Sequence, residues 1–222
     1  INRSKYNEEN SYSLAVVAFA AAAVQAQTTS ANIVGYSKSS YAGGFFISAN
    51  QFLGSSTVSE VYGDSLPANS KVYTFDGSSY TIASYGSVFV PGQGLVTQWD
   101  DDLSLSAGVG YWVETPSATE AVVSGEVESA AAVTNSISAG FQLVSYPYPV
   151  EVTVEDLDLS PASGDKVYVW DGTGYTIVSY GSVFVPGQGL VTQWDSNPTI
   201  GVGQGFWYET ATPQEWVANK PF

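Results

Sequence analysis

The sequence is dominated by an internal duplication. Residues 71–100 align with residues 166–195 at a constant spacing of 95, and 25 of these 30 positions are identical. The last 17 of them, starting at Ser84, are identical without exception. Weaker similarity continues on both sides, so the repeats are expected to span residues 27–127 and 128–222. Each repeat has the size of a small domain, and the chain must therefore fold as two copies of one unit.

Turn signals within each repeat separate short runs of alternating apolar and polar residues. The Asp-Gly pairs at 76–77 and 171–172 predict two-residue hairpins, a prediction that places Tyr73 opposite Tyr80. The two hairpins are expected to carry aromatic faces made of Tyr73, Phe75, Tyr80 and Ile82 in the first copy and Tyr168, Trp170, Tyr175 and Ile177 in the second. A second hairpin or tight corner is predicted where Pro91-Gly92-Gln93-Gly94 separates two further apolar runs.

Other runs in the first repeat complete a set of six or seven short strands. They are residues 45–52, 57–62, 108–114 and 121–127. This density of strands predicts an all-β fold: two tandem homologous β-sandwich or small β-barrel domains, following an N-terminal apolar helix or signal segment. The junction near residues 129–133 contains neither Pro nor Gly, so the two repeats are expected to pack closely.

Residues 1–26 differ in composition from the rest of the chain. Leu14 to Val24 is an apolar run, which small residues follow, and its length suits the core of a secretory signal peptide but not a bilayer span. A signal peptide predicts a secreted or cell-surface protein that is not an integral membrane protein after cleavage. Two alternatives stay open: a retained helix, as in a pilin-like subunit, or a buried Ala-rich helix.

Composition excludes several classes of function. The chain has no His, Cys or Met, so it offers no Ser-His-Asp triad, no Cys nucleophile and no thiolate or imidazole zinc site. A formal net charge of −15 argues against nucleic acid as a partner, because phosphate binding needs a basic surface. We therefore expect a non-enzymatic protein without a cofactor.

Four tryptophans recur at equivalent positions and are the candidate ligand-binding residues. Trp99 and Trp112 in the first repeat correspond to Trp194 and Trp207 in the second. Exposed aromatic rings on a β-face stack on sugar rings in many secreted modules, so polysaccharide is one expected partner. Trp in such strands is also a common core residue, and the sequence leaves both interpretations open.

The acidic residues offer two weaker hypotheses. Asp100-Asp101-Asp102 supplies oxygen ligands of the kind Ca²⁺ prefers, but the second copy reads Asp195-Ser196-Asn197, and no metal site is expected. Glu114 and Glu209 are the carboxylates to test for glycosidase chemistry, which needs only two acidic groups across a cleft.

Several motifs together resemble a family. They are Asn-Ile-Val-Gly-Tyr at 32–36, the strand at 43–52, the Lys-Val-Tyr hairpins and the late Gly-x-Gly-Tyr/Phe-Trp strand. In these motifs the chain resembles secreted tandem-repeat β proteins of verrucomicrobial-type bacteria. The resemblance implies a secreted or surface protein and transfers no catalytic residue.

These observations favour a structural or adhesive protein that self-associates through β-strand edges into a homopolymer such as an extracellular filament. The segment at 28–42 is expected to serve as a strand lent to a neighbouring copy. Its candidate assembly residues are Asn32, Ile33, Val34 and Tyr36.

Overall fold

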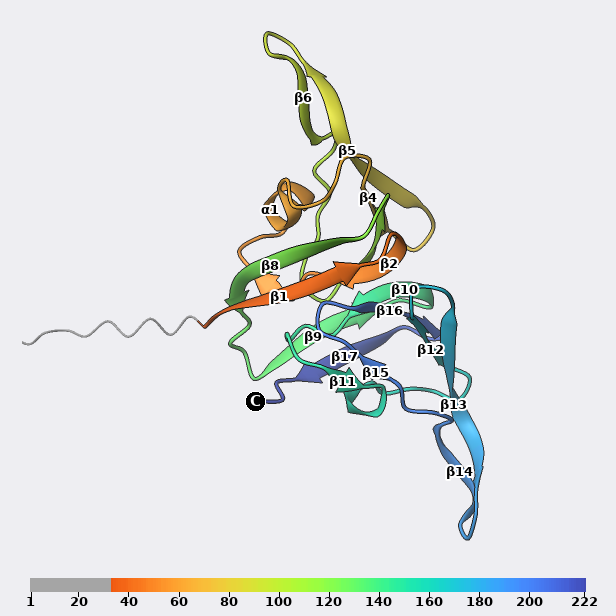
Figure 1. Ribbon diagram of the computed structural model, residues 1–222. Helices are drawn as coiled ribbons and strands as arrows, with labels where there is room; N and C mark the ends of the chain where they lie inside the picture. Colours follow the sequence, from red (N-terminus) through yellow and green to blue (C-terminus); the bar gives the residue numbers. More distant parts are fainter. Residues whose placement is uncertain (1–32) are drawn as a thin grey trace, which may run out of the picture. The chain divides into compact units, whose positions relative to one another are not determined.

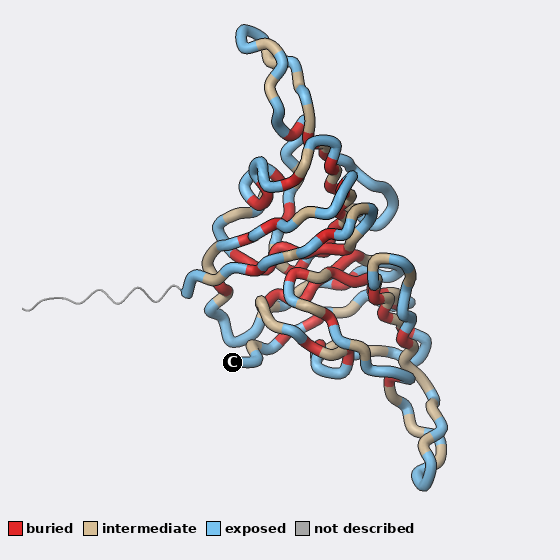
Figure 2. The backbone as a smooth tube through the Cα atoms, viewed as in Figure 1, coloured by how far each residue is buried: buried red, intermediate tan, exposed pale blue. Residues whose placement is uncertain are grey.

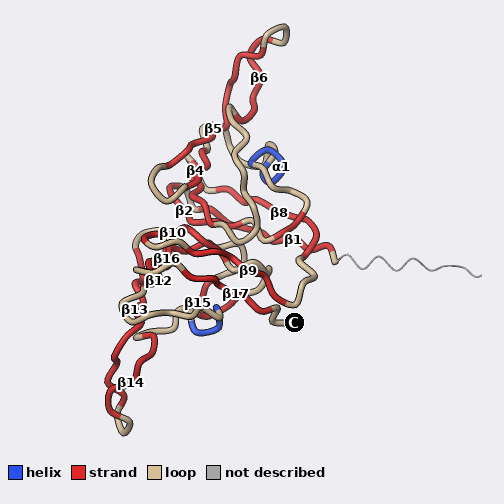
Figure 3. The backbone as a smooth tube through the Cα atoms, turned by 180° about the vertical axis from the view of Figure 1, so that it is seen from behind, coloured by secondary structure: helices blue, strands red, loops and turns tan. Residues whose placement is uncertain are grey.

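The computed structural model describes residues 33–222 (Figure 1). The predicted signal segment and Asn32 lie outside the described residues. Residues 33–222 belong to one compact unit. The predicted all-β fold is confirmed, since antiparallel strands make up most of the described chain (Figure 3). Within the described part, no helix is long and apolar enough to cross a membrane.

The first repeat forms two sheets. A five-stranded sheet has the order β2-β7-β4-β5-β6, and a three-stranded sheet has the order β1-β8-β3. The strands are β1 (Val34–Tyr41), β2 (Gly44–Ala49), β3 (Phe52–Leu53), β4 (Lys71–Phe75), β5 (Tyr80–Val90), β6 (Gly94–Trp99), β7 (Gly110–Thr115) and β8 (Thr119–Val127), with helix α1 at Val58–Tyr62.

The second repeat reproduces this plan. Its five-stranded sheet has the order β10-β16-β12-β13-β14, and two-stranded sheets β17-β9 and β11-β15 complete it. The strands are β9 (Ala132–Ile137), β10 (Gly140–Ser145), β11 (Val152–Thr153), β12 (Lys166–Trp170), β13 (Tyr175–Val185), β14 (Gly189–Trp194), β15 (Thr199–Ile200), β16 (Gly205–Thr210) and β17 (Gln214–Asn219), with the 3-10 helix η1 at Glu155–Leu157.

Each repeat has its own apolar core, and a smaller third cluster joins them. The inner face of each five-stranded sheet packs against the smaller sheets of the same repeat, around Tyr111 in the first copy and Trp216 in the second. The outer faces meet at the third cluster, whose buried members are Ile47, Leu143 and Trp207 (Figure 2). Two homologous cores therefore pack as one unit.

The predicted strand at 57–62 is wrong, because this segment is the short helix α1. Thr57 caps the helix, with its side-chain oxygen accepting from the Glu60 N–H, and the Glu60 carboxylate accepts from the Ser56 N–H. The first bond satisfies an N–H group that the helix start leaves free, and the second fixes the segment that leads into the helix. The Thr-x-x-Glu spacing carried this signal, while the alternating apolar residues suggested a strand.

The predicted aromatic faces are confirmed, but the turn lies one residue later than expected. Tyr73 pairs with Ile82, not with Tyr80, and Phe75 pairs with Tyr80. The Asp76 carboxylate accepts from the backbone N–H groups of the two serines that follow Gly77, which centres the turn after Gly77. Directly opposite residues point to one face, so the four side chains still lie together.

Contacts between the repeats occur in equivalent pairs. The Ala49 N–H donates to the Gly203 carbonyl at 2.9 Å, and the corresponding Ser145 N–H donates to the Gly108 carbonyl at 3.1 Å. A contact in which the same surface serves both partners is isologous, as in two-fold homodimers. The chain thus holds a two-fold-like dimer within one polypeptide.

Candidate functional site

Two long hairpins extend beyond the sheets (Figures 1 and 3). We name residues 86–98 the first arm and residues 181–193 the second arm. The pairing of β5 with β4 ends at Ser84, so beyond this point the first arm is a two-stranded ribbon of β5 and β6. Gly92 and Gly94 adopt positive φ at its tip, where only glycine is unstrained. The predicted hairpin around Pro91 is confirmed.

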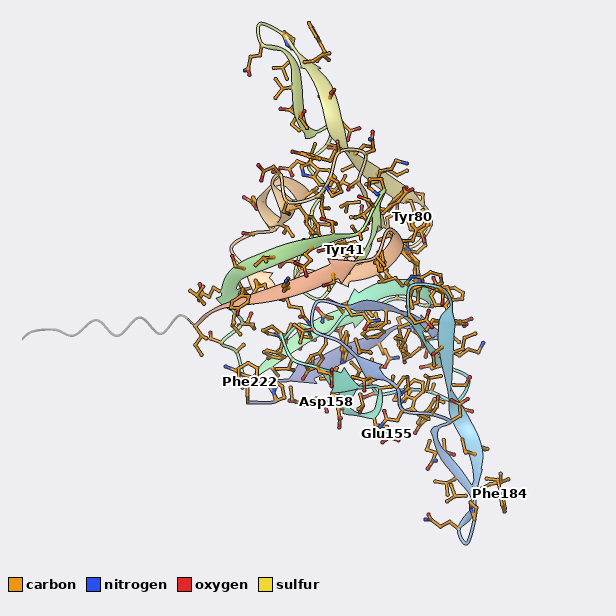
Figure 4. The ribbon with its side chains drawn as sticks, viewed as in Figure 1. Tyr41, Tyr80, Glu155, Asp158, Phe184 and Phe222 are labelled. Carbon is orange, nitrogen blue, oxygen red and sulfur yellow. The ribbon has the colours of Figure 1, made fainter. Side chains whose placement is uncertain are left out.

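The arms expose apolar side chains. Phe89 pairs with Leu95 across the first arm, and these side chains are 69% and 73% exposed. Phe184 and Leu190 pair in the same way on the second arm and are 70% and 73% exposed (Figures 2 and 4). A two-stranded ribbon has no second layer to cover such residues. The arms therefore present apolar surface that the described part of the chain leaves uncovered.

Sequence identity between the repeats is concentrated in these exposed arms. Both arms are identical and contain no charged residue. Several buried positions of the two cores differ, as in Tyr111 against Phe206 and Ala121 against Trp216. Folding constrains buried positions most strongly, because cores are close-packed, so folding alone would produce the opposite distribution.

The predicted donor strand pairs within its own chain. Val34 to Tyr41 forms β1 and pairs with β8, with Ser37 and Tyr41 facing the interior. Val34 and Tyr36 are each 75% exposed and Ile33 is 57% exposed, so these candidate assembly residues lie on the surface. Because β1 ends its sheet, its outer edge is the side on which a neighbouring strand would add.

Two aromatic clefts lie where the outer faces of the repeats meet. The first cleft has a volume of about 430 Å³ and is lined by Phe45, Tyr73, Tyr80, Trp112, Trp170 and Tyr175. The second cleft, also about 430 Å³, is lined by the equivalent side chains of the other repeat, with Phe75 in place of Trp170 and Ile177 added. Tyr80 and Tyr175 line both clefts. Figure 4 labels Tyr80 at this junction.

The rings of the first cleft meet at steep angles. The ring centroids of Phe45 and Trp112 are 6.1 Å apart with an interplanar angle of 87°, and those of Trp112 and Trp170 are 5.6 Å apart at 71°. The Trp170 indole N–H donates to the Phe45 carbonyl at 2.8 Å and joins the repeats. The rings thus form walls around one volume and do not make a flat strip.

The four predicted tryptophans separate into two groups. Trp99 and Trp194 are buried in the two cores, and Trp99 donates its indole N–H to the Gly63 carbonyl at 2.9 Å. Trp112 and Trp207 line the two clefts, although Trp207 is also buried and is only 8% exposed. Apart from Phe45 and Phe141, the other cleft-lining rings were expected as aromatic faces of the hairpins. They were not expected as parts of a site, because each cleft combines residues from both repeats.

The candidate acidic residues are engaged in local contacts. Glu114 accepts from the Tyr73 hydroxyl and lies 3.3 Å from the Lys71 ammonium, and Glu209 makes the equivalent contacts with Tyr168 and Lys166. Burial, followed by the hydrogen bond to Glu209, raises the pKa of Tyr168 to about 12. These phenols stay neutral near pH 7 and hold the carboxylates beside the clefts.

The acidic turn at 100–102 serves as a hydrogen-bond acceptor. Asp100 accepts from the Ser84 N–H at 2.6 Å, and Asp102 accepts from the Ser59 N–H at 2.8 Å. The Ser59 bond lowers the pKa of Asp102. In the described part of the chain, no group of three or more His, Cys, Asp or Glu side chains is placed to hold a metal ion.

In comparisons with known proteins, no family model, curated protein or solved structure matches this chain. The resemblance to verrucomicrobial secreted repeat proteins therefore stays a prediction.

Proposed function

We propose that this chain is a secreted, non-enzymatic structural protein that self-associates through its two arms, with a structural or adhesive role outside the cell. The observation that carries the proposal is the pair of identical, uncharged arms that expose Phe and Leu. Burying each such side chain contributes about 1.5–3 kcal/mol. Arm-to-arm contact between copies provides that burial.

Charge supports a second copy as the partner. The chain carries a net charge of −15, so most of its surface repels another copy. The arms contain none of this charge, and they can meet without bringing like charges together. Because both arms have one sequence, any arm matches any other arm.

The contact area of one arm and the number of arms on each copy determine the expected assembly. The apolar side chains of one arm offer on the order of a few hundred Å², whereas a stable interface buries about 800 Å² on each partner. A single arm contact is therefore weak. Because each copy has two arms, it can bind two neighbours, and such contacts extend a linear assembly of copies.

The test is sedimentation velocity of the full chain over increasing concentration, with electron microscopy of the largest species. Wild type should associate. Changing Phe89 and Leu95 to Ser should stop assembly at dimers, and adding Phe184→Ser and Leu190→Ser should leave monomers.

The matched control changes Val122 and Val217 to Ser. These equivalent residues are 54% and 42% exposed and lie outside the arms, so association should persist. The proposal fails if wild type stays monomeric at high concentration, or if the variant with all four arm substitutions associates as wild type does.

A further inference from the structure

The aromatic clefts are independent of the arms and present a different chemistry. In the first cleft, six rings from two repeats face one volume, and two of them, Trp112 and Trp170, meet at 71°. Trp170 and Tyr175 also meet steeply, at 60° with centroids 4.9 Å apart. Each ring face that borders this volume contributes negative electrostatic potential there, which attracts a cation.

This arrangement distinguishes between two classes of ligand. A sugar chain lies along rings that share a plane, and the angles of 48–87° between neighbouring rings of the first cleft do not provide one. A compact, roughly spherical group instead fits among rings that surround it. The steep angles therefore favour a compact cation over a polysaccharide.

The lining further selects the kind of cation. Aromatic carbon dominates the first cleft, and its polar atoms are mainly the phenol and indole groups of its own rings. An ammonium ion that carries N–H groups would lose water there without gaining enough acceptors. A quaternary ammonium group has no N–H and is weakly hydrated, so it loses little on entry.

The charged groups beside the clefts and the net charge of the chain are both compatible with a bound cation. Glu114 lies beside Tyr73 at the cleft, although Lys71 pairs with it at 3.3 Å and offsets its charge. Glu209, Tyr168 and Lys166 repeat this arrangement at the second cleft, where Lys166 lies 3.4 Å from Glu209. Because these local charges offset one another, the attraction for a cation comes from the net charge of −15 of the whole chain, which also repels anions.

We propose that the two clefts are aromatic cages for quaternary ammonium groups, two for each chain. The first cage is the stronger of the two, because Trp170 stands where the second has Phe75 and Trp is the best ring for cation–π contact. This inference does not rest on self-association through the arms.

The test is calorimetric titration of the full chain with choline and with 3,3-dimethylbutan-1-ol, its uncharged isostere. Choline should bind about 10-fold more tightly than the alcohol, because only the cation gains from the ring faces. Equal affinity for both compounds, or no binding of choline, would overturn the proposal. Binding of cello-oligosaccharides in preference to choline would overturn it as well.

The matched variant is Tyr80→Leu with Tyr175→Leu, which removes two rings from each cleft and keeps apolar bulk. Choline affinity should fall about 10-fold. The control, Tyr36→Leu, changes a tyrosine that is 75% exposed on β1 and should bind as wild type does. Circular dichroism establishes that the variants fold, and undiminished choline binding by a folded double variant would contradict the proposal.

Trp170→Phe separates the two sites. It makes the first cleft resemble the second, so the two binding events should become equivalent. Vesicles of phosphatidylcholine distinguish the source of the group: co-sedimentation assigns a lipid headgroup, whereas binding of free choline alone assigns a soluble compound.

Discussion

Gly205 faces Gly110 across the contact between the repeats, and a Cβ atom on Gly205 would lie 3.1 Å from the Gly110 Cα. The same Cβ would lie 2.9 Å from the Ser48 carbonyl oxygen and 2.8 Å from the Ile47 side chain. Backbone atoms cannot move aside as a flexible side chain can. The two equivalent glycines therefore set how closely the repeats approach.

Gly205→Ala is expected to destabilise the protein by about 3 kcal/mol through overpacking. Chemical denaturation measures the change. Gly174→Ala is the control, because its Cβ would meet nothing within 4 Å, and it should leave stability nearly unchanged. Similar stability for the two variants would show that the close approach is unimportant.

Gln51→Leu should cost about 3 kcal/mol of stability, because it leaves buried backbone groups without a partner. The Gln51 amide donates to the carbonyls of Tyr146 and Tyr148 at 2.9 and 3.0 Å and accepts from the Gly203 N–H at 2.8 Å. Gln93→Leu, at the exposed tip of the first arm, should change unfolding by less than about 0.5 kcal/mol. An equal effect of both substitutions would count against this role.

Tyr62→Phe should destabilise the first core by about 1–2 kcal/mol, because the buried hydroxyls of Tyr41 and Tyr111 lie 3.2 and 3.1 Å from the Tyr62 hydroxyl. Changing all three tyrosines to Phe should cost less than the sum of the single changes, since no buried Tyr111 hydroxyl then lacks a partner. The second repeat fills these places with Ile137, Leu157 and Phe206. Additive losses in denaturation experiments would argue against a linked network.

Stability should fall as pH rises above about 10. Burial raises the pKa of Tyr62 well above its usual value of 10.0 and, with weaker contributions from nearby acidic groups, that of Tyr146 to about 12. Folding therefore favours the neutral phenol, which contributes to the stability of the folded state. This stabilisation is complete below pH 10 and is lost as pH rises through 12. Denaturation midpoints between about pH 8 and pH 12 measure the slope.

The Tyr146→Phe variant tests the origin of this slope. It should begin less stable, because the Tyr146 hydroxyl donates to the Asn219 carbonyl at 2.6 Å, but it should lose less stability between pH 10 and 12. A slope identical to that of wild type would exclude Tyr146 as a contributor.

Self-association should strengthen when salt rises from roughly 10 mM to 0.5 M. The arms carry no charge, so salt has no attractive ion pair to weaken there, while it screens the repulsion between chains of net charge −15. Sedimentation velocity at several salt concentrations measures the effect. Dissociation by salt would instead indicate an interface held by charge.

Local sequence predicted most of the strands and their faces. Alternation of apolar and polar residues assigns Tyr73 and Phe75 to one face whether the turn is centred before or after Gly77, because a shift of two in the pairing preserves the face. The cross-strand pairing partners were less predictable, because the hydrogen bonds of the Asp76 carboxylate place the turn one residue later than the Asp-Gly pair indicated. At 57–62 two local signals conflicted, and the cap at Thr57 prevailed.

The candidate sites were only partly predictable, because they also depend on how strands pair and pack. The identity of the arms is visible in the sequence, but their exposure depends on where the pairing of β5 with β4 stops, at Ser84. Trp99 and Trp112 are equally apolar in the sequence. Only packing against the α1 segment buries Trp99 and leaves Trp112 at a cleft.

The sequence by itself determined that this protein is made of two copies of one all-β unit, and that their most faithfully repeated segment is uncharged. These are properties of composition and of short-range alternation, which act over a few residues. Tertiary structure alone decided which residues far apart in the chain come into contact, as Gly110 contacts Gly205 and Phe75 contacts Trp207. The physical reason is that such contacts depend on close packing of two folded surfaces, which no local pattern encodes.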